Sequence, residues 1–155
     1  MFLLDSQTTE EVTRIFKYLQ ETLPEEVYKR LFQVILTDNG HEFYDVNNIE
    51  CNHKTGEYIS HVFYCDPSAS WQKGGIEKNH EFIRYVLPKK TTFKNLTQNH
   101  CNIIANNINS LCRESLNNNC PFKAMLFLCD EKTLNMLNMY YIVPDEVQLN
   151  KDLIK

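Results

Sequence analysis

Apolar residues recur every three or four positions in the first part of the chain. Four of them share one face of a predicted helix that ends near Thr22: Val12, Ile15, Phe16 and Leu19. Residues 5–9 are polar and supply candidate N-caps for this helix. A second helical segment is predicted to begin at Pro24, because proline is favoured at the first position of a helix.

Two short apolar runs predict β-strands. Residues 34–36 are rich in branched side chains, which indicates a buried strand, and the turn residues 38–40 stop it. A second strand is predicted over residues 58–64, after a short helix or turn and a loop that occupy 44–58. The order of helix and strand indicates an α/β layer fold. The apolar residues 1–4 are interpreted as the end of a further strand.

Helical periodicity dominates the remainder of the chain. Four helices are predicted, over about 75–87, 97–116, 121–128 and 131–139. Pro88 ends the first of them, and Ile76, Ile83 and Leu87 form its apolar stripe. The apolar stripe of the second comprises Ile103, Ile104, Ile108, Leu111 and Cys112. The tail from Tyr140 onward is predicted to be irregular.

Length and composition indicate one soluble globular domain. The chain has 155 residues, of which 43% are hydrophobic and 12% aromatic. No apolar run approaches the length of a membrane span and the start lacks a signal peptide, so we expect a cytoplasmic protein without a membrane partner. The six cysteines are scattered, which indicates a reduced compartment. A weaker alternative is a zinc site, with irregular spacing, at Cys51, His53, His61 and Cys65.

The distribution of charge is more informative than the net charge of −4. Residues 71–94 contain two acidic side chains, Glu77 and Glu81. The same segment contains six basic ones: Lys73, Lys78, Arg84, Lys89, Lys90 and Lys94. A local basic patch of this kind suits contact with a phosphate backbone. A solvated helix face followed by a lysine-rich loop would give the same pattern.

Two carboxylates are further candidates for a functional site. Asp38 follows the predicted strand at 34–36, and Glu77 lies in the first turn of the predicted helix that follows Gly74 and Gly75. Asp-Asn-Gly is also ordinary turn chemistry, and a first-turn glutamate often only complements the helix dipole. The combination with nearby bases instead favours a pair that holds metal ions against a phosphodiester.

Four stretches of the sequence resemble a known family. They are Val34-Ile-Leu-Thr-Asp-Asn-Gly-His-Glu-Phe43, Trp71-Gln-Lys-Gly-Gly-Ile-Glu-Lys-Asn-His80, Phe82-Ile-Arg-Tyr-Val-Leu-Pro-Lys89 and Arg113-Glu-Ser-Leu-Asn-Asn-Asn-Cys-Pro121. The chain is similar there to the catalytic core of DDE transposases and retroviral-type integrases, and most of all to the insertion-sequence-30 family. The resemblance implies a ribonuclease-H-like α/β fold with added C-terminal helices, and DNA transposition or integration by metal-dependent phosphoryl transfer.

The resemblance also implies roles for individual residues. Asp38 resembles the second metal-binding aspartate and Glu77 the metal-binding glutamate, as catalytic ligands of two Mg²⁺ or Mn²⁺ ions. Asn39 and His80, and also His41, are expected to lie beside these carboxylates, and the alternative for the two histidines is a place on the surface without a role in the site. The residues expected to contact DNA are Trp71, Lys73, Lys78, Arg84, Lys89 and Lys90.

The family's first aspartate and its N-terminal DNA-binding region have no counterpart in this sequence. We therefore expect an incomplete core over 1–128, without its first strands, followed by a C-terminal helix and irregular tail over 129–155. Cleavage by this chain alone should be weak or absent. The alternative is a non-catalytic remnant of a transposase that binds DNA or forms multimers. Homo-oligomers are expected, and an uncovered apolar sheet face should favour self-association.

Overall fold

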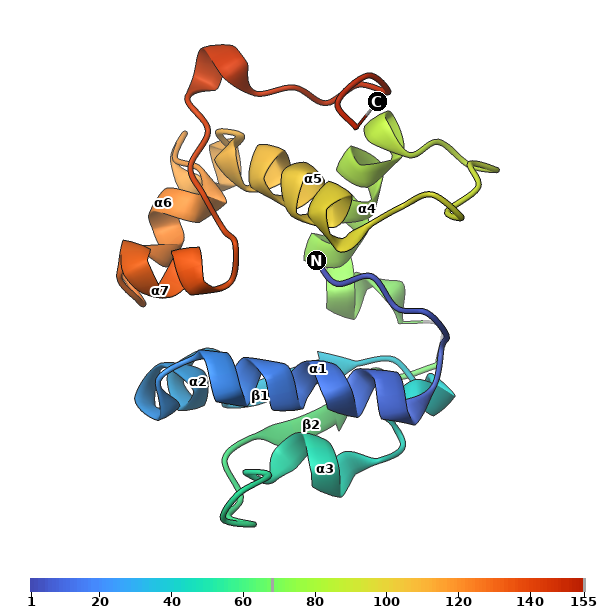
Figure 1. Cartoon of the computed structure of the whole chain (residues 1–155), viewed down its shortest axis with the longest axis vertical. Coiled ribbons are helices and arrows are strands. Elements are labelled where there is room, and N and C mark those ends of the chain that lie inside the picture. Colours follow the sequence, from blue (N-terminus) through green and yellow to red (C-terminus); the bar gives the residue numbers. More distant parts are fainter. Residues whose placement is uncertain (68, 155) are drawn as a thin grey trace. The chain divides into compact units, whose positions relative to one another are not determined.

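The computed structural model in Figure 1 describes residues 1–67 and 69–154, apart from the side chains of Ser70 and Lys73. The chain divides into two compact units. The strand unit comprises Leu4–Gln72, and the helical unit comprises Lys73–Lys155 together with Met1–Leu3. The predicted boundary between 128 and 129 lies within the helical unit and stays a prediction.

The strand unit begins with two helices, as predicted. Helix α1 spans Thr9–Thr22, and the side chain of Thr8 accepts a hydrogen bond from the Glu11 amide at its start. Helix α2 spans Glu25–Leu31. The Phe32 ring stacks on Tyr28 with 4.9 Å between centroids and meets Phe16 edge-on, which packs the end of α2 against α1.

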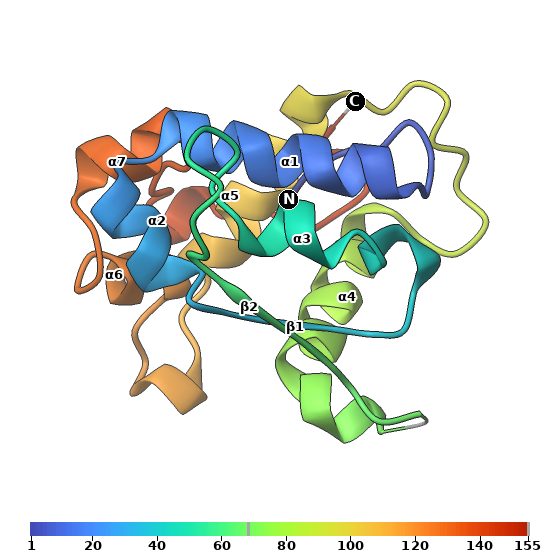
Figure 2. The ribbon, with the colours of Figure 1, turned by 90° about the horizontal axis from the view of Figure 1, so that it is seen from below.

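Two parallel strands follow, with two short helices between them. These elements are β1 (Val34–Thr37), η1 (His41–Phe43), α3 (Val46–Glu50) and β2 (His61–Tyr64). Leu36 pairs with Phe63 in the ladder, and in the view of Figure 2 the two strands overlap. The carboxylate of Glu50 accepts a hydrogen bond from the Val62 amide at 2.7 Å, which ties α3 to β2. A small parallel sheet with helices is compatible with the α/β prediction, whereas the ribonuclease-H-like core stays a prediction.

The prediction that residues 34–36 form a buried strand is wrong for one face of the sheet. Val34 is 61% exposed and Leu36 44% exposed, and Phe63 in β2 is 54% exposed. Side chains alternate between faces along a strand, so these three residues lie on the same face. α3 packs against β2, but an apolar face remains uncovered in the described structure.

We expect this uncovered face to drive self-association. Replacing Leu36 and Phe63 together by threonine keeps residues that favour strands while it removes apolar area, so the monomer fraction should rise. Sedimentation velocity of the variant and the unchanged chain at equal concentrations would measure this. Ile35→Thr, on the other face, is the matched control and should leave self-association unchanged. An unchanged chain that is already monomeric would contradict the expectation.

Among the described residues, the helical unit contains four α-helices and short 3₁₀ turns. They are α4 (Gly74–Val86), α5 (Gln98–Ser110), η3 (Glu114–Leu116), α6 (Pro121–Met125), α7 (Glu131–Met136) and η4 (Pro144–Glu146), and η2 (Ser70–Lys73) precedes α4. The core joins α4 to α5 through Val86, Leu87, Ile104 and Ile108. Ile76, predicted to face the core, is 44% exposed instead. None of the described helices is long and apolar enough to cross a membrane.

Helix α5 ends six residues before its predicted end. The Arg113 amide donates to the Asn119 carbonyl, and the Asn118 amide donates to the Arg113 carbonyl. These two bonds close a loop where a helix was expected. Asn117 and Asn118 both have positive φ, a conformation that asparagine tolerates well. Cys112 lies in this loop and is exposed, so its predicted place on the apolar stripe is wrong.

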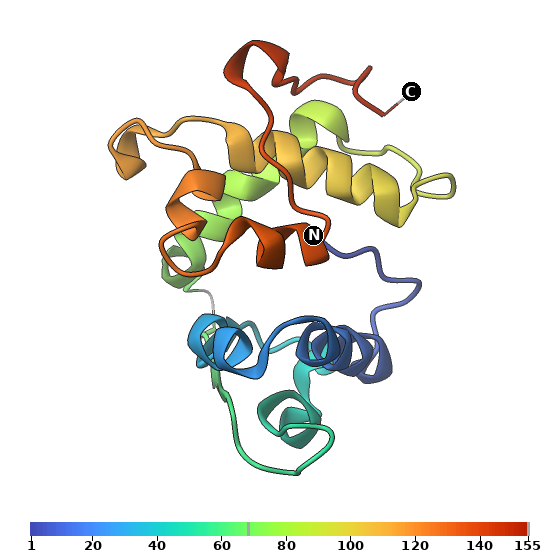
Figure 3. The same ribbon diagram turned by 60° about the vertical axis from the view of Figure 1, so that its left-hand side comes forward.

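Polar side chains of α5 hold the irregular tail in place. Asn106 donates to the Asn138 carbonyl and accepts from the Tyr140 amide. Asn107 accepts from the Gln148 amide at 2.7 Å, and Ser110 accepts from the Ile142 amide at 3.0 Å. Figure 3 shows the tail crossing α5. The prediction of an irregular tail is confirmed. Side chains of α5, rather than a neighbouring strand, accept hydrogen bonds from the tail amides of Tyr140, Ile142 and Gln148.

The prediction that residues 1–4 end a strand is wrong. The side chain of Gln98 accepts from the Leu3 amide and donates to the Met1 carbonyl, both at 2.9 Å. These bonds fasten the start of the chain to the first turn of α5, where its backbone is satisfied without a neighbouring strand. Burial lowers the pKa of the Met1 amino group below its usual value.

Candidate nucleic-acid interface

Asp38 lies where the two parallel strands end. The pairing continues one step beyond the strands, because the Cys65 amide donates to the Thr37 carbonyl at 2.8 Å. Asn39 then donates from its side-chain amide to the Cys65 carbonyl at 3.1 Å. Asn39 thus fastens the two strand ends together. Asp38 itself is exposed, at the carboxyl end of β1, where open α/β sheets place their sites.

Glu77 lies in the first turn of α4 and is exposed. His80 and Arg84 follow it three and seven positions later, so the three side chains share one face of the helix. Asp38 belongs to the strand unit and Glu77 to the helical unit. That the two carboxylates share an ion stays a prediction.

Asp38 and Glu77 supply only two of the three carboxylates in the metal site that the resemblance implies. Within residues 1–67 and 69–154, no three His, Cys, Asp or Glu side chains gather as a metal ligand group. The zinc alternative is therefore wrong, since its four residues are all described. His53 is instead held by Gln20 at 2.9 Å and Glu21 at 3.2 Å.

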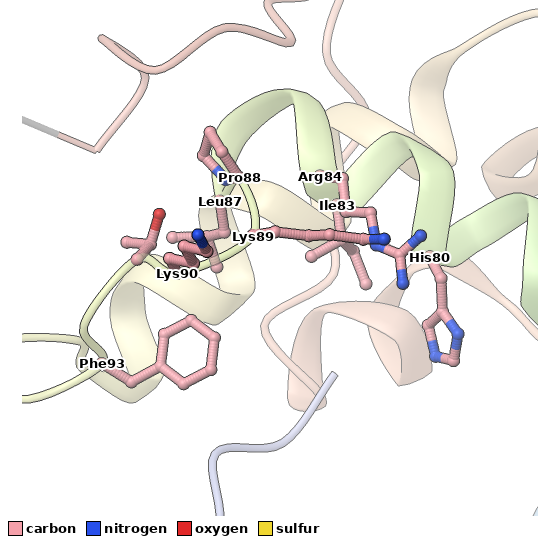
Figure 4. Close-up of a pocket in the computed structure, with 9 residues that line it drawn as sticks. His80, Ile83, Arg84, Leu87, Pro88, Lys89, Lys90 and Phe93 are labelled. Carbon is pink, nitrogen blue, oxygen red and sulfur yellow. The ribbon is translucent and has the colours of Figure 1, made fainter.

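Four residues singled out in the sequence line one groove of the helical unit. They are His80, Arg84, Lys89 and Lys90, shown in Figure 4. The groove has a volume of about 410 Å³, and its other walls are mainly apolar, with Ile83, Leu87, Pro88 and Phe93. The structure thus brings the helix face and the lysine-rich loop together around an apolar floor. Phe93 is the residue that sequence reasoning missed, although an aromatic ring beside two lysines is a recognisable signal.

The end of α4 determines the shape of this groove. Leu87 still donates to the Ile83 carbonyl, and Pro88 then ends the helix. The Thr91 amide donates to the Pro88 carbonyl at 3.1 Å, which closes a turn around Lys89 and Lys90. Lys90 has a φ of 72°, which a side-chain-bearing residue adopts at a cost. The turn directs the chain back along α4, so that both lysines border the same groove as Arg84.

The cations of the groove differ from others in the chain. Lys78 donates to Glu81 at 2.6 Å, and Arg14 donates to Glu11 at 2.7 Å, so these two charges are already paired. In the part of the chain that the structure describes, Arg84, Lys89 and Lys90 have no acidic partner. Their charge is therefore available to an anion such as phosphate.

The remaining predicted contacts with DNA lie elsewhere. Trp71, in η2, is 77% exposed and belongs to the strand unit. The side chain of Lys73 lies outside the described residues. Arg113, in a stretch that carries the family resemblance, has a structural place: it donates to Asn79 at 3.1 Å and covers the Phe82 ring. Burial lowers the pKa of this guanidinium from its usual value.

Known relatives of this chain are transposases. The transposase of insertion sequence element IS1086 from Cupriavidus metallidurans is 30% identical over 95 residues, which cover 61% of this chain and 26% of the relative. Transposase InsI of IS30A from Escherichia coli is 36% identical over 55 residues, or 36% of this chain and 14% of the relative. The IS4351 transposase from Bacteroides fragilis is 32% identical over 89 residues, or 57% and 26%.

The matched region spans about a quarter or less of the length of these curated relatives. No family model and no solved structure matches the chain. The resemblance drawn from the motifs is nevertheless confirmed: the chain is similar in sequence to transposases of insertion sequences, IS30 among them.

Proposed function

We propose that this chain is the part of a transposase that acts on DNA, with Asp38 and Glu77 as ligands of catalytic Mg²⁺ or Mn²⁺. The observation that carries the proposal is the similarity to insertion-sequence transposases over 61% of the chain. The groove that Arg84, Lys89 and Lys90 line supports DNA as the substrate, since these cations have no acidic partner among the described side chains.

The carboxylates and the cations of the proposed site have different roles, which follow from their chemistry. When bound, two metal ions would activate the attacking oxygen and stabilise the leaving oxygen of a phosphodiester. Asp38 and Glu77 provide exposed carboxylates of the kind that such hard cations prefer. Arg84, Lys89 and Lys90 hold the DNA backbone by charge, which positions the strand without reading its sequence.

We expect this chain alone to cleave DNA weakly or not at all. Two-ion catalysis depends on carboxylates that bridge both ions, and only two of the three in the family's pattern are present. A cytoplasmic location and a homo-oligomeric state stay predictions of the sequence.

Binding of Mn²⁺ tests the carboxylate pair without requiring cleavage. Mn²⁺ broadens the nuclear magnetic resonance signals of nearby protons, so residues around Asp38 and around Glu77 should broaden at the same Mn²⁺ concentration. Asp38→Asn and Glu77→Gln should each weaken this binding by about tenfold or more, because each removes one charged ligand. Asp5→Asn, at an exposed aspartate of the strand unit, is the matched control and should leave binding unchanged.

Two outcomes would count against the proposal. One is broadening around only one of the two carboxylates. The other is Mn²⁺ binding that survives both substitutions. A parallel incubation of the purified chain with plasmid DNA and Mg²⁺ would measure cleavage. Strong cleavage that Asp38→Asn abolishes would show that the chain is more active than expected.

A further inference from the structure

The groove of the helical unit combines two kinds of surface. Its cations are Arg84, Lys89 and Lys90, and its floor includes Ile83 and the buried Leu87. Contact with the outside of a DNA duplex requires cations and hydrogen-bond donors but no apolar floor. An unpaired base, in contrast, has an apolar face that must be covered, and its phosphates must be neutralised nearby.

Phe93 gives the groove an aromatic ring that the core does not use. The ring is 59% exposed, although Leu96, three residues later, packs against the core. Two turns hold the backbone here, because Thr91 donates to the Pro88 carbonyl and Leu96 donates to the Phe93 carbonyl at 2.9 Å. The ring is therefore held at the surface beside the lysines rather than left on an unstructured loop. Figure 4 shows Phe93 at one end of the groove and His80 at the other.

The backbone conformation of Lys90 also supports a binding role for this groove. A φ of 72° is a conformation that glycine or asparagine adopts at lower cost than lysine. Such strain is retained mainly where a side chain is needed for binding or catalysis. Here the conformation turns the chain so that Lys89 and Lys90 both border the groove.

We propose that this groove binds single-stranded DNA, with one base stacked on Phe93 and the neighbouring phosphates held by Arg84, Lys89 and Lys90. The inference rests on the proposed function for its substrate class and extends it from DNA in general to an unpaired strand. Arg84 lies seven residues after Glu77 on the same helix face, a rise of roughly 10 Å. A strand in the groove therefore passes within one to a few nucleotides of the candidate metal ligand.

Binding of fluorescein-labelled oligonucleotides by the whole chain tests this proposal. Fluorescence anisotropy would be measured with a 15-nucleotide single strand, the matching duplex and an RNA strand of the same sequence. Phe93→Leu keeps an apolar side chain but removes the ring, so affinity for the single strand should fall about 5- to 150-fold. Affinity for the duplex should change much less. Phe93→Tyr keeps the ring and should bind nearly as the unchanged chain does.

Phe127→Leu is the matched control, because Phe127 is 85% exposed in the same unit but does not line this groove. It should leave binding unchanged, and circular dichroism should show that all the variants are folded. The proposal is overturned if Phe93→Leu weakens both DNA forms equally or neither, or if the RNA strand binds more than about tenfold tighter than the DNA strand. Loss of Mn²⁺ binding at the carboxylates with an intact Phe93 effect would overturn only the proposed function.

Discussion

Replacing Arg84, Lys89 and Lys90 together by glutamine is expected to lower the affinity of the chain for single-stranded DNA by about 30- to 100-fold at low salt. The reason is that these cations have no acidic partner among the described side chains, so each can neutralise a phosphate and release a counterion. Removal of three such contacts should also reduce the slope of log affinity against log salt by about 2, at roughly 0.7 for each phosphate.

Anisotropy titrations between about 50 and 200 mM salt would measure both quantities. A second triple variant, with Lys17, Lys29 and Arg30 of the strand unit changed to glutamine, alters the net charge equally and serves as the control. It should lose little affinity, since Lys29 is paired with Glu25. Equal losses in both variants would mean that overall charge, and not the groove, determines binding.

Removing the three polar side chains that hold the tail should have the largest effect on stability. The triple variant Asn106→Ala, Asn107→Ala and Ser110→Ala deletes four hydrogen bonds, three from amides of the tail and one to the Asn138 carbonyl just before it. Each contributes about 1 kcal/mol, so the free energy of unfolding of the helical unit should fall by about 2–4 kcal/mol. Leu149 and Leu153, which pack against the α4–α5 core from this tail, should become more exposed.

Urea unfolding followed by circular dichroism would give the stability, and hydrogen exchange would report on the tail itself. The amides of Tyr140, Ile142 and Gln148 should exchange faster in the variant, since they lose their acceptors. Asn109→Ala is the matched control, on the same helix but outside these tail contacts. Alanine favours a helix more than asparagine does, so Asn109→Ala should cost little or nothing. An equal loss of stability in this control would mean that the tail contacts do not explain the effect of the triple variant.

Local patterns predicted the elements of the fold well. Helix α1 ends at Thr22, as its apolar period predicted, and its N-cap, Thr8, is one of the polar residues 5–9 that were candidates for this position. Pro88 ends α4 for a covalent reason that no tertiary contact can alter. Sequence patterns predicted the structure less well where a local signal competes with a contact to a residue far away in the sequence. Residues 1–4 look like a strand, but Gln98 satisfies their backbone instead.

The candidate site also combines features that the sequence predicted with features that only the structure shows. The bases at 84, 89 and 90 and the carboxylates at 38 and 77 were evident from composition and from the family resemblance. Their grouping was not, because it depends on the turn at Lys90 and on how Leu87 and Leu96 pack. Phe93 could have been noted beside the lysines, yet only its 59% exposure distinguishes it from a core residue.

By itself the sequence determined most of the helices and the two paired strands, the charge of the segment that follows Trp71 and the similarity to transposases. These properties are local: they follow from residue spacing, capping and side-chain chemistry. The tertiary structure decided that Val34, Leu36 and Phe63 are uncovered, that α5 holds the tail and that three cations line one groove with an aromatic ring. The first two depend on contacts between residues distant in sequence, and the groove depends on the turn at Lys90 and on the packing of Leu87 and Leu96 against the α4–α5 core. Burial and hydrogen-bond partners are fixed only when such contacts form.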